Sequence, residues 1–174
     1  KCGVCQYCRM GRDELCTHVR SLGISLDGGY AEYVVAPEIN VYTIPEWMAF
    51  EEAAAIPIAF HTAWHCLTTR AQLRPGEDVL IHAAGSGVGS AAIQVAKLLG
   101  ARVIGTVSTQ EKARAVRSAG CDRVILYTEQ DFEAEVRRFT EGRGVQVVYD
   151  SVGKTTFDKS INCLAPRGYM ILYG

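Results

Sequence analysis

Four cysteines stand close together at the start of the chain, in a pattern suited to binding a metal ion. Cys2, Cys5 and Cys8 are separated by two residues each, and Cys16 follows after seven more. One loop can therefore wrap four thiolates around a single tetrahedral ion, and zinc accepts this arrangement because its filled d shell imposes no geometry of its own. The spacing predicts a closed structural site that would hold residues 1–20 in shape and leave no position open for a substrate.

Other chemistry for these four cysteines fits less well. Unligated thiols or two disulfides would also use four cysteines. An iron–sulfur cluster needs four thiolates but usually at other spacings, and a nucleic-acid-binding zinc finger needs a basic surround that Arg9, Arg12 and Arg20 are too few to provide. The other three of the seven cysteines lie singly in apolar surroundings, which favours a metal site plus buried thiols.

A glycine-rich segment, HAAGSGVGSAAIQVAK, joins an expected strand to an expected helix. In that setting Gly87 and Gly89 allow the backbone to approach a pyrophosphate, while the helix N-terminus supplies amide donors and a positive dipole. The spacing departs from the common dinucleotide fingerprint, because Ala84 and Ser86 occupy the other two glycine positions when Gly89 is aligned as the last. A purely structural strand–helix turn, or the cofactor loop of a methyltransferase, would look similar.

The end of the next expected strand indicates which dinucleotide would bind. NAD enzymes place an Asp or Glu there against the ribose hydroxyls, whereas Gly105 to Thr109 is small and neutral. Lys112 follows one helical turn later, where its ammonium could meet a 2′-phosphate. This favours NADPH, and the alternative is that Lys112 is simply a solvated helix residue.

The elements that must position these residues alternate regularly from Asp78 onward, which predicts a doubly wound parallel α/β sheet. Ser108 and Glu111 have the spacing of a capping box at the start of one helix. The expected strands cover residues 78–84, 101–107, 123–127, 145–150 and 169–173, and the expected helices cover residues 89–99, 108–120, 131–141 and 155–164.

Before Asp78 this alternation is absent. Residues 1–20 show almost no hydrophobic periodicity, as expected of a loop that no core holds. Tyr30 to Ala36 is rich in Val and Tyr and predicts short strands, whereas Glu51 to about Leu73 is rich in Ala and predicts a helix broken at Pro57.

The composition excludes several classes of protein. Lys and Arg number 18 against 19 Asp and Glu, so the net charge of -1 offers no basic field for nucleic acid. No apolar run reaches the length of a membrane-spanning helix, so no membrane partner is expected. Lys1 and Cys2 open the sequence without a secretory leader, and a cytoplasmic protein with small-molecule partners is therefore expected.

Several segments together resemble the medium-chain dehydrogenase/reductase superfamily across the whole chain. They are KCGVCQYC with Cys16, GGYAEYVVAP, EEAAAIPIAFHTAW, HAAGSGVGSAAIQVAK, GTVSTQEK and VVYDSVG. The cysteine cluster resembles the structural zinc lobe of the zinc alcohol dehydrogenases, and the later half is closer to the quinone oxidoreductases. The resemblance implies a partial GroES-like catalytic domain over residues 1–58 and a C-terminally truncated Rossmann domain over residues 59–174, so that both ends of the full enzyme are lacking.

The resemblance also implies a set of residues that bind NADP(H), although it assigns no catalytic residue. Its members are Ser86, Gly87, Val88 and Gly89 for the pyrophosphate, Ser108, Lys112 and Tyr127 for the adenosine 2′-phosphate, Ser151 and Val152 for the adenine or ribose, and Thr62 for the nicotinamide.

Departures from the family concern its catalytic zinc. Two of the ligands belong to an N-terminal segment outside this sequence, and the third, a cysteine in the alcohol dehydrogenases, aligns with Ile58, which cannot bind a metal. His61 and His65 share one helical face and could substitute, but histidines at this spacing are more often packing or surface residues.

The function implied by the resemblance is an NADP-dependent oxidoreductase that moves a hydride between NADPH and a carbonyl, quinone or enone, with a homodimer or homotetramer as the full-length form. Three alternatives remain. A zinc-dependent alcohol dehydrogenase would carry a second zinc, a non-catalytic NADPH-binding protein would bind the cofactor without turnover, and a zinc-ribbon interaction module would ignore nucleotides.

Overall fold

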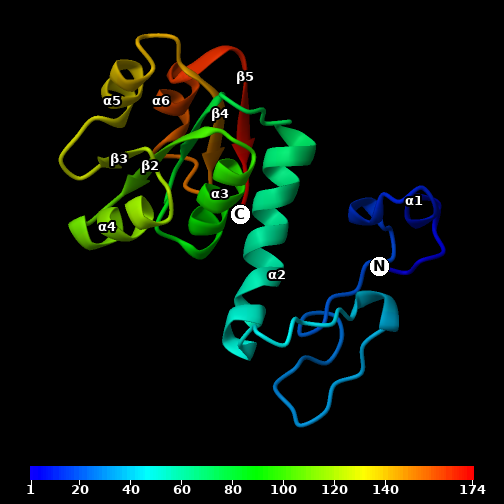
Figure 1. Ribbon diagram of the computed structural model, residues 1–174. Helices are drawn as coiled ribbons and strands as arrows, with labels where there is room; N and C mark the ends of the chain where they lie inside the picture. Colours follow the sequence, from blue (N-terminus) through cyan, green and yellow to red (C-terminus); the bar gives the residue numbers. More distant parts are fainter. The chain divides into compact units, whose positions relative to one another are not determined.

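A parallel sheet forms the centre of residues 49–174, one of the two units into which the chain divides. The computed structural model describes residues 1–174 and places five strands in the order β3-β2-β1-β4-β5 (Figure 1). Neighbouring strands are parallel throughout, which confirms the doubly wound sheet predicted from the alternating pattern. The strands are β1 (Asp78–Ile81), β2 (Arg102–Val107), β3 (Arg123–Leu126), β4 (Val145–Asp150) and β5 (Leu164–Leu172).

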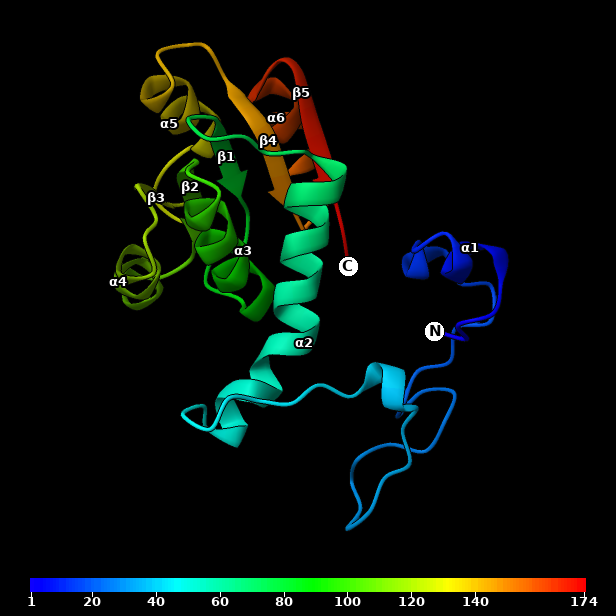
Figure 2. The same ribbon diagram turned by 45° about the vertical axis from the view of Figure 1, so that its right-hand side comes forward.

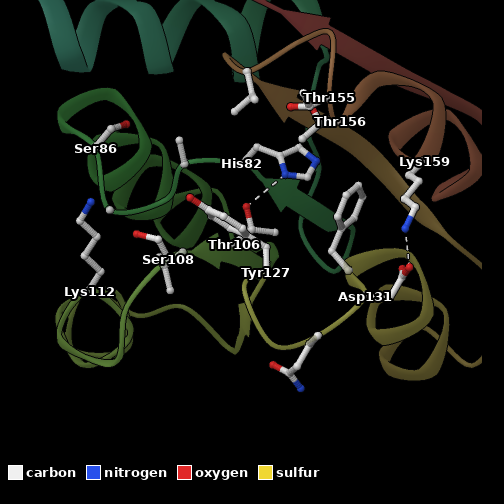
Figure 3. A pocket seen from close by; sticks show the side chains of 16 residues that line it. His82, Ser86, Thr106, Ser108, Lys112, Tyr127, Asp131, Thr155, Thr156 and Lys159 are labelled. Atoms are coloured by element: carbon white, nitrogen blue, oxygen red, sulfur yellow. Dashed lines mark hydrogen bonds and ion pairs between the residues drawn. The ribbon is translucent and has the colours of Figure 1, made fainter.

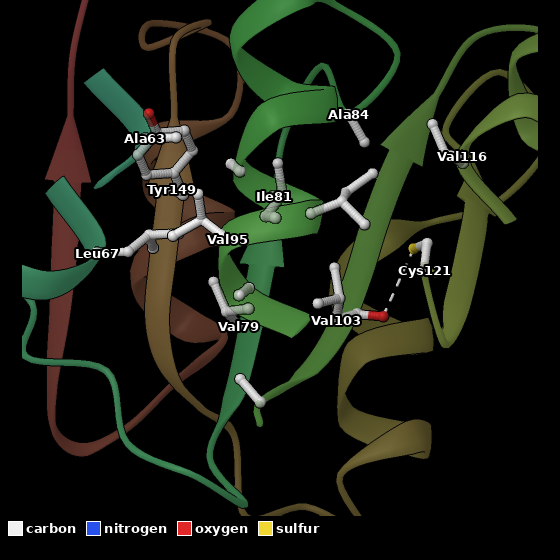
Figure 4. Close-up of a cluster of buried hydrophobic side chains, with 14 of the residues drawn as sticks. Ala63, Leu67, Val79, Ile81, Ala84, Val95, Val103, Val116, Cys121 and Tyr149 are labelled. Atoms are coloured by element: carbon white, nitrogen blue, oxygen red, sulfur yellow. Dashed lines mark hydrogen bonds between the residues drawn. The ribbon is translucent and has the colours of Figure 1, made fainter. Parts of the chain in front are cut away.

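Helices cover both faces of this sheet, as a second view shows (Figure 2). On one face Val79 and Ile81 of β1 join Val95 of α3 in a buried cluster that also includes residues of α2 and α4 (Figure 4). On the other face Leu80 joins Phe132 of α5. Successive residues of β1 therefore pack into two cores, one on each face of the sheet. This explains why Val79, Leu80 and Ile81 are all apolar. The helices are α2 (Phe50–Trp64), α3 (Gly87–Leu98), α4 (Gln110–Ser118), α5 (Phe132–Phe139) and α6 (Phe157–Asn162).

Helix α2 runs through Pro57 without a break, so the predicted interruption there is wrong. A proline removes one backbone donor, and the helix continues beyond it to Ala59, Phe60 and Ala63, which pack in a buried cluster. After α2 the chain forms a π-helical segment, η3 (His65–Arg70), so the helical region ends slightly before Leu73. The chain divides into its two compact units after Met48, whereas the family resemblance implied a division between residues 58 and 59, within α2. Neither α2 nor any other helix is long and apolar enough to cross a bilayer.

The N-cap of helix α4 lies one residue later than predicted. Its N-cap is Thr109, whose hydroxyl oxygen accepts a hydrogen bond from the amide of Lys112 at 3.2 Å. The expected capping role of Ser108 is therefore wrong, because the chain is still leaving β2 at that residue and caps the helix only at the next one. This leaves the side chain of Ser108 available at a cavity described below.

The unit of residues 1–48 contains short helical turns and no strand. The strands predicted for Tyr30 to Ala36 are absent, and the side chains of Tyr30, Tyr33 and Val35 are exposed. High β propensity does not suffice here, because a strand without a neighbour leaves its N–H and C=O groups unpaired. Cys16 is the one buried residue of this unit, so no hydrophobic core holds it together. Its elements are α1 (Gln6–Arg9), η1 (Asp13–Leu15) and η2 (Glu38–Asn40).

Candidate functional site

A cavity of about 500 Å³ opens at the carboxyl ends of β1, β2, β3 and β4 (Figure 3). The chain winds from β1 outward to β3 and then returns to the other side of β1 as β4, so the cavity lies where the winding reverses. Open α/β sheets bind ligands at this point because the loops on either side diverge and leave a crevice. The polar lining residues are His82, Ser86, Thr106, Ser108, Lys112, Tyr127, Gln130, Asp131, Thr155, Thr156 and Lys159.

The glycine loop forms one edge of the cavity and leads directly into α3. Ser86 is the N-cap of α3, and its hydroxyl oxygen accepts a hydrogen bond from the amide of Gly89 at 3.1 Å. Gly89 itself is buried, and a Cβ there would lie 2.4 Å from the carbonyl oxygen of Ala83. A Cβ at Gly87 would meet nothing within 4 Å. The two glycines therefore differ: Gly89 lets the helix pack against the strand end, and Gly87 keeps the space before the helix open.

Lys112 lines the cavity on the side of the glycine loop. Its ammonium group has no carboxylate partner within 4.0 Å. Its aliphatic stem crosses Gly85, where an added Cβ would lie 3.3 Å from the Cδ of the lysine. Ser86, Ser108 and Tyr127 line the same side of the cavity as the lysine (Figure 3). An unpaired ammonium beside two or three hydroxyl groups is a suitable site for a phosphate.

The opposite wall of the cavity contains polar residues that the sequence did not indicate. Lys159 of α6 forms an ion pair with Asp131, the N-cap of α5, and this partner lowers the pKa of the aspartate. His82 lies on the floor, where burial lowers its pKa. These residues are far apart in the sequence and meet only because of the strand order. The one signal in the sequence was at His82, a polar residue that follows directly after the apolar residues of β1.

The residues predicted to bind NADP(H) divide into two groups. The structure brings Ser86, Ser108, Lys112, Tyr127 and Val152 together as lining residues of the one cavity. The other five lie outside its lining: Gly87, Val88 and Gly89 form the first turn of α3 beside the cavity, Ser151 borders a separate shallow hollow, and Thr62 lies on α2, where its hydroxyl donates to the carbonyl of Ile58 at 2.7 Å.

The four clustered cysteines form a second candidate site. The sulfur atoms of Cys2, Cys5, Cys8 and Cys16 all lie within 4.8 Å of one another. Tetrahedral zinc with Zn–S bonds of about 2.3 Å would space them by about 3.8 Å, so the cluster fits such an ion. Hydrogen bonding to the backbone of Cys8 lowers the pKa of Cys5 to about 6, whereas desolvation raises the pKa of Cys8 to about 12. All seven cysteines are free, which argues against the alternative of two disulfides.

The two histidines of the α2 region do not form a comparable metal site. His61 is exposed, and the Nε2 of His65 accepts a hydrogen bond from the Nε of Arg70 at 3.1 Å. Neither histidine belongs to a cluster of three potential ligands, and Ile58 is 80% exposed. Within residues 1–174, the cysteine cluster is the one group of three or more side chains placed to share a metal ion.

Two protein-family models match the chain. Residues 1–46 match the alcohol dehydrogenase GroES-like domain, which confirms the GroES-like region expected at the start. Residues 87–174, about half of the chain, match the zinc-binding dehydrogenase model. This second match begins at Gly87 and includes the cavity-lining residues from Thr106 to Lys159.

Individual proteins show the same likeness. A 2-haloacrylate reductase from a Burkholderia species is 42% identical over 149 residues, which cover 84% of this chain and 45% of that protein. A crystal structure of an NAD-dependent alcohol dehydrogenase matches with a TM-score of 0.95 and 46% identity, over 99% of this chain and 50% of that one. Quinone oxidoreductase from Escherichia coli, complexed with NADPH, matches with a TM-score of 0.72 and 42% identity, over 76% and 41% of the two chains. The chain spans about half the length of the curated relatives it matches.

Proposed function

Because this chain belongs to the medium-chain dehydrogenase/reductase superfamily, we propose that it is the core of an oxidoreductase that moves a hydride between NADPH and a carbonyl, quinone or enone. The observation that carries the proposal is the cavity at the carboxyl ends of the strands, with Lys112 on its wall and the N-terminus of α3 at its edge. A cation and a helix N-terminus placed near each other suit a ligand with phosphates at two positions, as NADPH has.

The residues of this chain would bind and orient the dinucleotide. The bound nicotinamide supplies or accepts the hydride. The pyrophosphate would face the start of α3, formed by Gly87, Val88 and Gly89. The amides of Gly87 and Val88 have no partner within the helix, whereas the amide of Gly89 already donates to the hydroxyl of Ser86. Val152, with Ser151 beside it, would lie along the adenine or ribose, and Thr62 would lie near the nicotinamide by the family resemblance.

The proposed preference for NADPH over NADH rests on the groups around Lys112. The end of β2 carries no acidic side chain to accept hydrogen bonds from a ribose 2′-hydroxyl. Lys112, Ser108 and Tyr127 instead offer one positive charge and two hydroxyl groups to a 2′-phosphate. Similar structures include one described as NAD-dependent and one that contains NADPH, so they do not distinguish the two cofactors. The proposed preference for NADPH therefore rests on the residues around Lys112 in this chain.

Replacing Lys112 with alanine tests this assignment. The loss of one charge-assisted contact to the phosphate costs about 1.5 to 3 kcal/mol, so the Kd for NADPH should rise by about ten- to a hundredfold. The Kd for NADH should change by less than about threefold, because NADH has no phosphate for the lysine to bind. Arg117→Ala is the matched control, since it removes another cation of α4 that does not line the cavity. Equal effects of Lys112→Ala on both nucleotides, measured by fluorescence titration, would refute the role.

For the cysteine cluster we propose a structural zinc ion bound by Cys2, Cys5, Cys8 and Cys16. The support is a set of four thiol sulfurs within 4.8 Å of one another in a unit that has no hydrophobic core. Four protein ligands would complete tetrahedral coordination, so the ion would stabilise the loop and would not bind a substrate.

A zinc-dependent alcohol dehydrogenase is the second candidate function. It is favoured by one observation: the similarity to an NAD-dependent alcohol dehydrogenase structure covers 99% of the chain, including the cysteine cluster. Such an enzyme would bind a second, catalytic zinc, and Ile58 at the position of one of its ligands opposes this. Two zinc ions per full-length chain would support the dehydrogenase, and one would support the reductase.

For the whole protein we propose a cytoplasmic homodimer or homotetramer that acts on a small molecule. The division into residues 1–58 as part of the catalytic domain and residues 59–174 as the nucleotide-binding domain belongs to the same proposal. Its support is the family resemblance and the balanced charge of the chain. Sedimentation of the full-length protein would determine the number of subunits.

A further inference from the structure

His82 joins several elements beneath the cavity. It follows β1, the central strand, and is 1% exposed. Its Nδ1 lies 3.1 Å from the hydroxyl oxygen of Thr106 on β2, and its Nε2 lies 2.9 Å from the hydroxyl oxygen of Ser160 on α6. The ring also packs edge-on against Phe132 of α5, with 4.8 Å between ring centroids. One side chain therefore fixes the ends of β1 and β2 relative to two helices. Figure 3 shows its hydrogen bond with Thr106.

The surroundings of His82 keep its imidazole neutral. The acidic group whose charge acts on His82 is Asp150 of β4, and its carboxylate already accepts three hydrogen bonds from Val152, Gly153 and Thr156. Lys159 of α6 and Asp131 at the start of α5 also line the cavity, but they pair with each other. A neutral imidazole donates from one nitrogen and accepts at the other, and a hydroxyl group can complement either role. Both ring nitrogens are therefore satisfied without a charge.

The hydrogen bond to Thr106 acts on the part of the cavity proposed to select the cofactor. Thr106 lies on β2, two residues before Ser108, and is 2% exposed. Its carbonyl oxygen accepts a hydrogen bond from the amide of Ala84 at 3.0 Å. The side chain and the backbone of Thr106 thus both tie the end of β2 to the loop after β1. Ser108 and Lys112 extend from this fixed point.

We propose that His82 is a positioning residue that sets cofactor selectivity by holding Thr106, and through it Ser108 and Lys112, at the distance a 2′-phosphate requires. This inference rests on the proposed binding of NADPH in the cavity. In this role His82 acts through β2 and does not itself bind the phosphate. Removing the imidazole leaves two buried hydroxyl groups without a partner and removes the side-chain tie between the end of β2 and the loop after β1, so that only the backbone bonds remain.

The test compares the Kd values of the 174-residue chain for NADPH and NADH by fluorescence titration. His82→Leu and Thr106→Val should each raise the Kd for NADPH by about tenfold and that for NADH by less than about threefold. His82→Gln should stay within about threefold of the wild type for both nucleotides, because its amide again offers one donor and one acceptor. Thr68→Ala is the control, since it removes a hydroxyl that donates to the carbonyl of Trp64, away from the cavity.

Each outcome of this test has a definite meaning. Equal weakening of both nucleotides, or no weakening, in variants that are folded by circular dichroism overturns the inference, because a merely structural role would not change the ratio of the two Kd values. If His82→Leu fails to fold, the nearly isosteric Thr106→Val decides the question alone. A folded wild-type chain that binds neither nucleotide overturns the proposed function itself, and this is seen before any variant is measured.

Discussion

Replacing Gly89 with alanine is expected to destabilise the unit of residues 49–174 severely. The new Cβ would lie 2.4 Å from the carbonyl oxygen of Ala83 and 2.9 Å from the Cα of Ala84, so one of these backbone segments would have to move. Ala83 already adopts a left-handed conformation, with φ of 49°, in the tight turn after β1. We expect the free energy of unfolding to fall by about 3 kcal/mol, measured by urea denaturation.

Gly87→Leu is the matched variant in the same loop, and it should have the opposite profile. A Cβ at Gly87 meets nothing within 4 Å, so the variant should fold with nearly the stability of the wild type. Its side chain would occupy the space in which the pyrophosphate is proposed to lie, and the Kd should rise by about a hundredfold or more for NADPH and NADH alike. Unchanged titrations would mean that the pyrophosphate lies elsewhere. A fully stable Gly89→Ala protein would contradict the close packing of α3.

The sheet could be predicted from the sequence because each strand carries its own evidence. Val79, Leu80 and Ile81 form an unbroken apolar run, and a strand buried on both faces requires one. The strands predicted for Tyr30 to Ala36 failed because their formation depends on a partner strand, which local composition does not reveal. The break predicted at Pro57 failed because the loss of one backbone hydrogen bond does not by itself end a helix that continues on both sides of the proline.

The candidate site was predictable only in part. The side that contains Ser86, Ser108 and Lys112 follows from a short stretch of sequence and from the family resemblance, and the structure gathers these residues around one cavity. The side that contains His82 and Lys159 could not be derived, because it depends on β4 lying beside β1 and on α6 packing behind them. Residues in an apolar run, such as His82 after DVLI, give no sign of the partners that they meet across the sheet.

Removal of metal is expected to unfold the first twenty residues while leaving the nucleotide cavity intact. The unit of residues 1–48 buries only Cys16, so packing contributes little to its stability, whereas zinc bound by four thiolates contributes about 10 to 16 kcal/mol of binding free energy in small domains. The unit of residues 49–174 has two buried apolar clusters and no group of metal ligands. Hydrogen exchange after chelation should therefore lose protection in residues 1–20 and keep it in β1 and β2.

A single substitution should reproduce the effect of the chelator if the four cysteines bind one ion. Cys5→Ser leaves three thiolates and a weak hydroxyl ligand, so the metal content should fall from one zinc per chain toward zero, measured by mass spectrometry of the purified protein. Cys66→Ser is the matched control, because it makes the same change at a cysteine outside the cluster, and it should retain the zinc. The Kd for NADPH should be unchanged in Cys5→Ser. A chelated or substituted protein that lost nucleotide binding together with the metal would show that the cluster also supports the cavity, and would contradict the structural role proposed for the zinc.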